Sequence, residues 1–503
     1  MYWLEPSLDR LWKSLDKFFP LFRLLRAFEK NDLIYVSAWS FRLAEWCVIF
    51  LPVQVLRGQV TQSDWERFDY YARRVKSFCY IHDPDSLDIA MHVYFRIAQL
   101  RSAPLLPSLR HLKCPHMSPD DFLISSICLF LTPSLKFLHF EKITAVEDKL
   151  IGTFLHTLLC EGARIQQVTL TGEGLTKDTL GYLGRCVCLR SLILRGMGKH
   201  VGIELIRSLG RLSVLERLEL DLEESGLMTV HDSGRNETQT TASHGDSAAK
   251  VAMNSGAGEG EFGFRELTWL ELVAPLSFVK TFLVQIGTTQ LRHIGFEFSL
   301  EDPVDRRELL ACVALRWRDT VTYIRMMHTP DPHNPIPEVS MDALSPLFNL
   351  TELKHLEIES HAIEMTNRDI QDIADAPWAS KIHTLRLPFV STENARPSIS
   401  ALQVLSGQCP ELRYLTIPIS TWDMLQEERT TLHRLRVLTV ASSDERLSLV
   451  PALRLARIID RLFPFLERVC VQGEETEGGR WAQVHAMVRM YQSVRADIDP
   501  DLE

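Results

Sequence analysis

Apolar residues recur in one short pattern along most of the chain. Thirteen stretches follow the form Leu-x-x-Leu-x-Leu, with other apolar residues substituting at the three leucine positions. The first stretch begins at Leu109 and the last runs from Leu466 to Val471. Successive stretches begin 23 to 32 residues apart, except for one gap of 52 residues between Leu215 and Leu267. A pattern with this period predicts a chain built from similar units in series.

The spacing within one stretch predicts a strand with one apolar face. In residues 215–220 the second and third leucines fall on one side of a strand, and Arg217 and Glu219 fall on the other. One such unit cannot bury its apolar face alone, so the units must stack and pair their strands in parallel. Residues 151–159 and 455–463, between strands, have helical periodicity. The pattern predicts an α/β leucine-rich-repeat solenoid, with parallel strands on one face and helices on the other.

The rest of the chain divides by composition. A capping box at Ser63-Asp64-Trp65-Glu66 predicts a helix in a small N-terminal cap, and residues 118–121 predict another helix start. Residues 225–262 are rich in glycine and small polar residues, so we expect a disordered loop there. The predicted order is a short segment with a linker helix (1–36), an apolar segment (37–58), a helical cap (59–104), the repeat array (105–472), and a C-terminal cap helix with an acidic tail (473–503).

Charge and cysteine content argue against several classes of function. The formal net charge is −10 and no block of lysine and arginine stands out, whereas a general nucleic-acid binder needs a basic surface. The ten cysteines form no Cys-x-x-Cys element and are typical of free thiols in a reducing compartment. Neither a signal peptide nor an apolar run long enough for a bilayer is evident. We therefore expect a cytoplasmic or nuclear protein without membrane contact.

The sequence carries no signature of catalysis. It contains no Gly-x-Ser-x-Gly, no phosphate-binding loop followed by lysine and no His-Glu-x-x-His. We expect no catalytic residues, no cofactor and no metal site. Solenoids of this kind offer extended surfaces to other macromolecules, so the prediction is a protein-interaction module.

The outward positions of the predicted strands form the candidate binding surface. Aromatic and arginine side chains carry most of the energy at protein interfaces, although such side chains also cover sheets merely as solvated groups. The outward positions are Phe137, His139, Arg195, Arg217, Glu219, Trp269, Glu271, His293, His355, Glu357, Arg386 and Tyr414; the predicted contacts to a protein target are Arg195, Arg217, Trp269, His293, His355, Arg386 and Tyr414.

Three N-terminal segments resemble one family. Residues 3–12, Trp-Leu-Glu-Pro-Ser-Leu-Asp-Arg-Leu-Trp, resemble the end of the F-box in fungal, especially basidiomycete, F-box proteins, with the pattern W-x-E-P-A-L-D-x-L-W. Residues 18–25 are similar to the family's continuation. Residues 60–75 resemble the helix W-x-R-F-x-x-Y-A-x-R-V that opens its repeat region. The resemblance implies a substrate-recognition subunit of an SCF-type ubiquitin ligase, and the alternative is a free-standing repeat scaffold.

The resemblance departs from the family's pattern at two places. An F-box has roughly 40 to 50 residues, near the lower limit for independent folding, and most of it would lie before Met1. We therefore expect residues 1–503 to bind the ligase adaptor subunit weakly or not at all. Residues 37–54 read as an insertion, either a retained intron or an extra helix. The residues that the resemblance assigns to the adaptor-binding remnant are Trp3, Leu4, Pro6, Leu8, Leu11 and Trp12.

Overall fold

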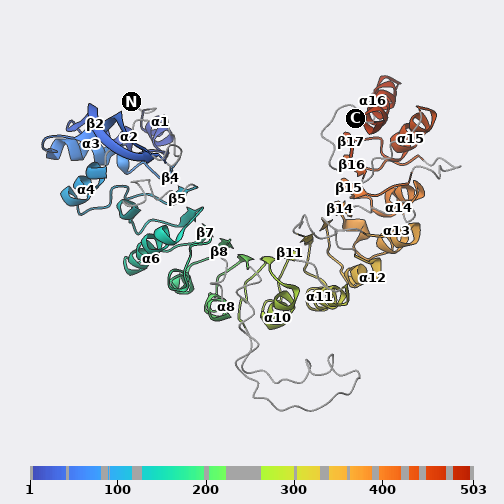
Figure 1. The fold of residues 1–503 in the computed structure, drawn as a ribbon. Helices are drawn as coiled ribbons and strands as arrows, with labels where there is room; N and C mark the ends of the chain where they lie inside the picture. Colours follow the sequence, from blue (N-terminus) through green and yellow to red (C-terminus); the bar gives the residue numbers. More distant parts are fainter. Residues whose placement is uncertain are drawn as a thin grey trace, which may run out of the picture. The chain divides into compact units, whose positions relative to one another are not determined.

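The chain folds into two compact units, residues 1–266 and 267–503. In both units helices cover one side of a row of strands (Figure 1). The structure is a computed structural model. It describes residues 4–40, 45–80, 89, 91–115, 127–196, 203–222, 262–298, 303–328, 339–359, 363–387, 396–420, 430–440, 449–471 and 480–498.

The first unit contains a parallel sheet whose strands follow one another in chain order. Its helices include α1 (Leu4–Leu11), α2 (Phe19–Phe22), α3 (Gln62–Ala72), α4 (Met91–Leu100), α6 (Ala145–Cys160), α7 (Lys177–Gly181) and α8 (Ile203–Gly210). The paired strands are β1 (Ser14–Leu15), β4 (Ser77–Cys79), β5 (His111–Cys114), β6 (Phe137–Phe140), β7 (Gln167–Thr171), β8 (Ser191–Arg195) and β9 (Arg217–Asp221).

The second unit repeats this arrangement. Its helices include α10 (Leu276–Gln285), α11 (Pro303–Arg316), α12 (Met341–Leu344), α13 (Asn367–Ala374), α14 (Ser400–Gln408), α15 (Leu449–Leu462) and α16 (Arg480–Ile498). The paired strands are β10 (Trp269–Val273), β11 (His293–Phe298), β12 (Tyr323–His328), β13 (His355–Ile358), β14 (Thr384–Arg386), β15 (Tyr414–Ile417), β16 (Val437–Val440) and β17 (Arg468–Val471).

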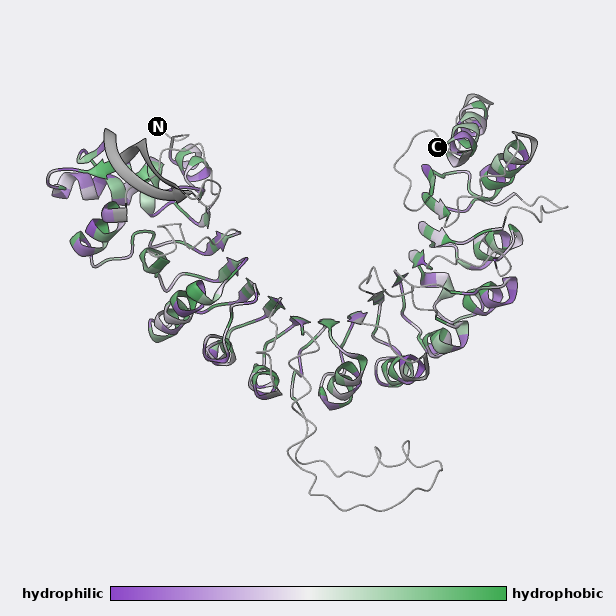
Figure 2. Cartoon of the chain, viewed as in Figure 1, coloured by the Kyte–Doolittle hydropathy of each residue, from purple (hydrophilic) through white to green (hydrophobic). Residues whose placement is uncertain are grey.

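The predicted repeat pattern is confirmed. Each of the thirteen Leu-x-x-Leu-x-Leu stretches contains one strand, from β5 to β17. Residues of one register position stand opposite each other on neighbouring strands: Leu192 pairs with Leu218, and Leu270 pairs with Ile294. These inward side chains are buried. Figure 2 shows the hydrophobic residues distributed through the strands and helices of both units, which together form an α/β leucine-rich-repeat solenoid.

Buried tryptophans join neighbouring repeats behind the strands. Trp317 and Trp378 are both fully buried. The indole of Trp317 donates to the backbone carbonyl of Thr288 at 2.9 Å, and that of Trp378 donates to the carbonyl of Leu347 at 2.9 Å. Each hydrogen bond satisfies a buried backbone carbonyl of the preceding repeat. The large rings therefore add apolar contact without leaving the indole N–H unpaired.

The last strand of the second unit is covered by a helix. Helix α16 packs on α15 and on β17. The backbone N–H of Val469 donates to His485 Nδ1 at 3.2 Å, and Gln492 donates to the carbonyl of Leu466 at 2.9 Å. Two side chains of α16 therefore use backbone hydrogen-bonding groups at and just before β17.

The N-cap residue of helix α3 lies two residues before the predicted cap, Ser63. Thr61 is its N-cap residue: the backbone N–H of Thr61 donates to the Asp64 carboxylate at 2.9 Å, and the Thr61 hydroxyl accepts from the Asp64 N–H. The capping box therefore joins Thr61 and Asp64. The prediction that Ser63 starts the box was wrong, because the extended backbone of Thr61 already presents its hydroxyl to the first turn.

The N-terminal region contains more strand than the sequence predicted. Strands β1 and β4 join the parallel sheet before the first recognised repeat. Two strands form an antiparallel pair, β2 (Phe28–Ser40) with β3 (Glu45–Leu56). An extra helix in residues 37–54 is therefore wrong, and the boundary expected after residue 36 falls inside β2.

Some expected elements lie outside the described residues. These are the helix start at 118–121 and residues 225–261 of the expected loop. The last residue of that loop, Phe262, is described and is buried, with its carbonyl against Gly210. The described chain therefore resumes with a residue that is packed into this unit.

We predict that Leu218→Ala lowers the free energy of unfolding by about 2–5 kcal/mol, because Leu218 is fully buried on β9 and its truncation leaves a cavity. Arg217→Ala should change it by less than about 1 kcal/mol, because Arg217 is partly exposed on the opposite face. Chemical denaturation of both variants measures the difference. Equal losses would show that the strand register is shifted by one residue.

A second prediction concerns pH. His433 is buried; its Nδ1 accepts from the Leu435 N–H at 3.1 Å and its Nε2 donates to the carbonyl of Cys409 at 2.6 Å. Burial lowers the pKa of His433 below its usual value. The unfolded chain therefore binds a proton that the folded chain does not, and stability falls as pH falls from about 7 to about 5.

Replacement of this histidine tests the assignment. His433→Gln removes the titrating group. The usual histidine pKa, about 6.5, lies between pH 5 and pH 7. The unfolding free energy lost between pH 7 and pH 5 should therefore be smaller in the variant than in the parent. Denaturant titrations at both pH values measure the double difference. The same pH slope in both proteins would exclude His433 as a source of acid sensitivity.

Candidate protein-interaction surface

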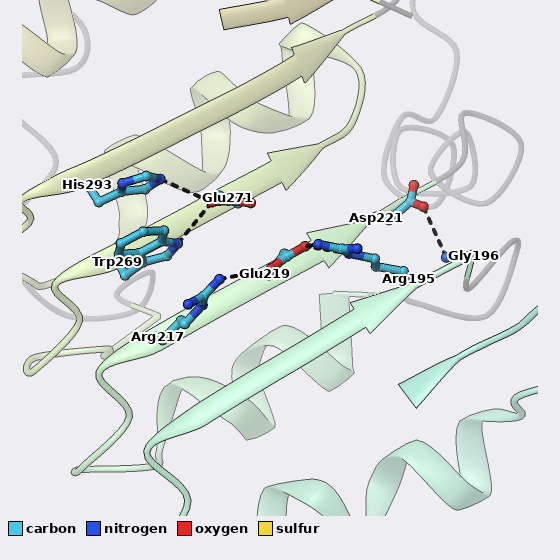
Figure 3. A network of polar contacts seen from close by, with 8 residues as sticks. All are labelled: Arg195, Gly196, Arg217, Glu219, Asp221, Trp269, Glu271 and His293. Carbon is cyan, nitrogen blue, oxygen red and sulfur yellow. Dashed lines mark hydrogen bonds and ion pairs between the residues drawn. The ribbon is translucent and has the colours of Figure 1, made fainter. Parts of the chain in front are cut away.

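Two predicted arginines of the first unit share one carboxylate. Arg195 of β8 and Arg217 of β9 both form ion pairs with Glu219, the Arg217 pair at 3.5 Å (Figure 3). The Glu219 side chain is only 6% exposed, whereas both guanidiniums are substantially exposed. A buried acceptor thus holds two cations in fixed positions on the sheet face. The arginines are available at the surface, but their positive charge is partly balanced.

A turn beside these arginines is held by a second carboxylate. Gly196, which follows β8, has a φ of 65°, a left-handed conformation that glycine adopts without strain. Its N–H donates to the carboxylate of Asp221 at 3.0 Å (Figure 3). The contact joins the ends of β8 and β9 and so fixes the end of the strand from which Arg195 projects.

Four aromatic side chains of the second unit stand in one row across strands β10 to β13. Trp269, His293, Tyr323 and His355 occupy the same register position on neighbouring strands. The ring centroids are 3.4 Å apart for Trp269 and His293, and 4.1 Å apart for His293 and Tyr323, with interplanar angles of 7° and 12°. Tyr323 and His355 lie 5.6 Å apart. We call these four residues the aromatic row. Parallel strands are about 4.8 Å apart, a spacing suited to stacking.

A carboxylate adjoins the first two rings of the aromatic row. Glu271 accepts from Trp269 Nε1 and from His293 Nε2, both at 3.1 Å (Figure 3). Its neighbour in the register is Gly295 on β11. A Cβ atom at Gly295 would lie 2.8 Å from Glu271 Cγ. The absence of a side chain at Gly295 therefore gives Glu271 the room to lean toward His293.

Further carboxylates follow on β13. Tyr323 hydrogen-bonds Glu357, and burial together with this carboxylate raises the pKa of the Tyr323 phenol. The Arg325 guanidinium lies 3.3 Å from the Glu359 carboxylate. The Arg386 guanidinium lies 3.4 Å from the Glu359 carboxylate and 3.7 Å from that of Glu357. The tyrosine stays protonated at neutral pH and acts as a hydrogen-bond donor toward the sheet face.

The last ring of the aromatic row, His355, has a hydroxyl group and a second imidazole as neighbours. His355 Nδ1 lies 3.0 Å from Thr384 Oγ1, and the His355 ring is 5.8 Å from the His383 ring. Burial, followed by the charge of His383, lowers the pKa of His355. The imidazole is therefore neutral near pH 7 and offers a hydrogen-bonding ring edge without a charge.

The predicted target contacts differ in how much surface they present. Arg195 and Arg386 are exposed, and Tyr414 on β15 is 43% exposed. Arg217, Trp269 and His355 are half-buried. His293 is only 6% exposed between Trp269 and Tyr323, so it supports the aromatic row more than it contributes surface.

Sequence reasoning missed several residues of this surface, among them two on one strand. Tyr323 and Arg325 lie on β12 at outward positions, opposite His293 and Gly295. The stretch 321–326 was recognised as a repeat, so counting its outward positions would have found both. The hydrogen bond from Tyr323 to Glu357 depends on the approach of two strands and has no counterpart in a single stretch.

Of the residues assigned to the adaptor-binding remnant, those that the structure describes lie on or beside helix α1. Trp3, and the side chain of Leu4, lie outside the described part of the chain. Pro6 and Leu11 are exposed, Leu8 is half-buried, and the Trp12 ring lies 4.7 Å from the Tyr71 ring of α3. The structure therefore places part of this set at the surface and uses Trp12 in packing.

An ion-pair cluster holds α1 against α3. Arg74, just after α3, has a side chain that is 5% exposed and bonds the carboxylates of Glu5 and Asp9 on α1. The Tyr70 hydroxyl also donates to Glu5 at 2.5 Å. Glu5 and Asp9 therefore provide two carboxylates for one largely buried guanidinium. The segment resembling the end of an F-box is thus attached to the segment resembling the family's opening helix.

The described residues provide neither a metal site nor a membrane span. Within the described ranges, no group of three or more histidine, cysteine, aspartate or glutamate side chains is arranged to hold a metal ion. No helix of the described chain is long and apolar enough to cross a membrane.

Two solved structures with low sequence identity are similar to parts of this chain. No family model matches the sequence, and no curated protein matches it. The yeast Rad7–Elc1 complex contains a chain with 13% identity and a TM-score of 0.36, covering 71% of this chain and 84% of that one. A leucine-rich-repeat protein of Leptospira interrogans has 12% identity and a TM-score of 0.28, covering 81% and 92%. Likenesses this weak add nothing to the architecture, which rests on the strand pairing described above.

We predict that Gly295→Ala destabilises the protein by about 1–3 kcal/mol, because the added methyl group overlaps the Glu271 side chain. In a Glu271→Ala background the same change should have a much smaller effect, since the overlapping atoms are gone. A double-mutant cycle by chemical denaturation measures the coupling between the two positions.

Gly407→Ala serves as the control. This glycine lies in α14 with no atom within 4 Å of an added Cβ, so alanine there should stabilise by about 0.5–1 kcal/mol. Additive effects of Gly295→Ala and Glu271→Ala would show that Glu271 does not lie across Gly295.

Proposed function

We propose that the sheet face opposite the helices binds a protein target, and that the chain is a substrate-recognition subunit of an SCF-type ubiquitin ligase. The aromatic row carries the first half of this proposal. Its rings are stacked before any partner arrives, so binding does not have to order them, and pre-ordered aromatic groups are typical of strong protein contacts.

The N-terminal packing supports the second half. A substrate receptor has to hold its adaptor-binding module in a fixed position relative to its substrate surface. Arg74 joins Glu5 and Asp9 of α1 to the end of α3 through charge-assisted hydrogen bonds. In the proposed receptor, in which residues 3–12 would be the end of an F-box, this contact would be the junction between the two modules.

The alternative is a free-standing repeat scaffold, which would use the same sheet face without a ligase. Chemical cross-linking in the source cells, followed by purification of the full chain, separates the two because cross-linking retains weak complexes. Adaptor and cullin subunits attached to the chain would support the ligase role. A partner set without them would support the scaffold.

The target surface yields its own prediction. Trp269→Ala combined with Tyr414→Ala should reduce the recovery of specific partners by about tenfold or more, because each substitution removes exposed aromatic area from the sheet face. Quantitative mass spectrometry of the cross-linked partners measures this recovery.

A matched pair on the helix side provides the control. Val284 and Leu315 are exposed apolar residues of α10 and α11. Their replacement by alanine should leave partner recovery within about twofold of the parent. If the control pair has the larger effect, the binding surface lies on the helix side and the proposal is wrong.

A further inference from the structure

Charge on the sheet face of the second unit is unevenly distributed. The outward positions of β10 to β14, with the residue that follows β13, carry the carboxylates of Glu271, Glu297, Glu357 and Glu359, and the guanidiniums of Arg325 and Arg386. Four negative and two positive groups leave a formal charge of −2. We call these six residues, together with the aromatic row, the acidic face.

The corresponding positions of the first unit are balanced. Strands β7 to β9 present Arg195 and Arg217 against Glu219 and Asp221, two charges of each sign. The excess of carboxylates is therefore particular to the acidic face and does not simply follow from the negative charge of the whole chain.

Two carboxylates of the acidic face, Glu271 and Glu357, are held in position by ring donors, and Glu357 and Glu359 also contact the two arginines of the face. Trp269 and His293 hydrogen-bond Glu271, and Tyr323 hydrogen-bonds Glu357. The Trp269 indole and the protonated Tyr323 phenol orient these oxygens without adding a positive charge. Oriented carboxylates beside packed rings suit a cationic side chain, whose apolar stem can lie along the ring edges while its head meets the oxygens.

We propose that the acidic face binds a protein segment with closely spaced arginine or lysine residues. This inference rests on the proposed function and names the chemical class of its target. Arginine should bind more tightly than lysine, because the guanidinium is planar, less strongly hydrated and able to make two parallel hydrogen bonds to one carboxylate. The face is pre-ordered, since Trp269, His293 and Tyr323 are already stacked.

Synthetic peptides test the charge preference directly. Fluorescein-labelled peptides of about twelve residues, built on glycine and serine, would carry four arginines, four lysines, four glutamines or four glutamates. Fluorescence anisotropy with the full chain measures their affinities at low and moderate salt. We expect the order arginine, lysine, glutamine, glutamate, with weaker arginine binding at higher salt. Preference for the glutamine or glutamate peptide would overturn the inference.

Two double variants separate the acidic face from general attraction to a negative protein. Glu357→Gln with Glu359→Gln removes two charges from the face. Glu308→Gln with Asp342→Asn removes two charges from exposed ion pairs on helices α11 and α12. We expect the face variant to weaken arginine-peptide binding by about tenfold and the helix variant by less than about twofold. Equal losses would overturn the inference.

The folding of every variant is checked by thermal denaturation, and Glu271→Gln provides a further variant that keeps an acceptor for Trp269 Nε1. Loss of arginine-peptide binding in Glu271→Gln supports the inference independently of Glu357 and Glu359. The proposed function has its own test. If Trp269→Ala combined with Tyr414→Ala leaves the recovery of cross-linked partners unchanged, the sheet face binds no target. If those partners are lost but their bound segments are acidic, only the basic preference is wrong.

Discussion

Burial of one apolar strand face against neighbouring repeats is the interaction on which the rest of the structure depends. Each strand is only two to six residues long in the parallel array, too short to be stable in isolation. Its inward leucines become buried only when the next strand is hydrogen-bonded beside it and a helix covers the other side. Leu218 pairs with Leu192 in this way. Stability and order of the outward side chains therefore have a common origin.

The same register that aligns the core also aligns the polar face. Since side chains alternate along a strand, an aligned inward leucine forces the next residue into an aligned outward position. Trp269, His293 and Tyr323 stack because Leu270, Ile294 and Ile324 are paired in the core. The aromatic row is a property of four separate repeats held in one register, and no single repeat could produce it.

The sequence was sufficient for the architecture because its signal is periodic. Thirteen apolar stretches share the same internal spacing, which predicts the position of each strand and the side chains that it buries. This prediction does not depend on the segments between the strands. The prediction of secondary structure from the sequence was wrong or incomplete where the apolar pattern was not periodic. Strand β4 (Ser77–Cys79) has one central phenylalanine in place of the leucine pattern, and the pair β2 and β3 reads as an apolar run that suits either a helix or a strand.

The candidate surface was predictable only in part. Outward positions follow from alternation, so Arg217 and Trp269 were found from their own strands. Exposure does not follow in the same way: His293 is covered because two neighbouring rings enclose it. Arg74 was likewise beyond a local reading, since its carboxylate partners Glu5 and Asp9 are 69 and 65 residues away along the chain. Contacts between residues this far apart in the sequence cannot be predicted from one local stretch.

Helix α16 also determines what the second unit does not do. A parallel sheet ends in a strand whose outer hydrogen-bonding groups can recruit a strand from another molecule. At β17 the Val469 N–H is taken by His485 and the Leu466 carbonyl by Gln492. A foreign strand would have to displace both side chains and the helix that carries them. Helix α16 therefore occupies backbone hydrogen-bonding groups at this end of the unit that an added strand could otherwise use.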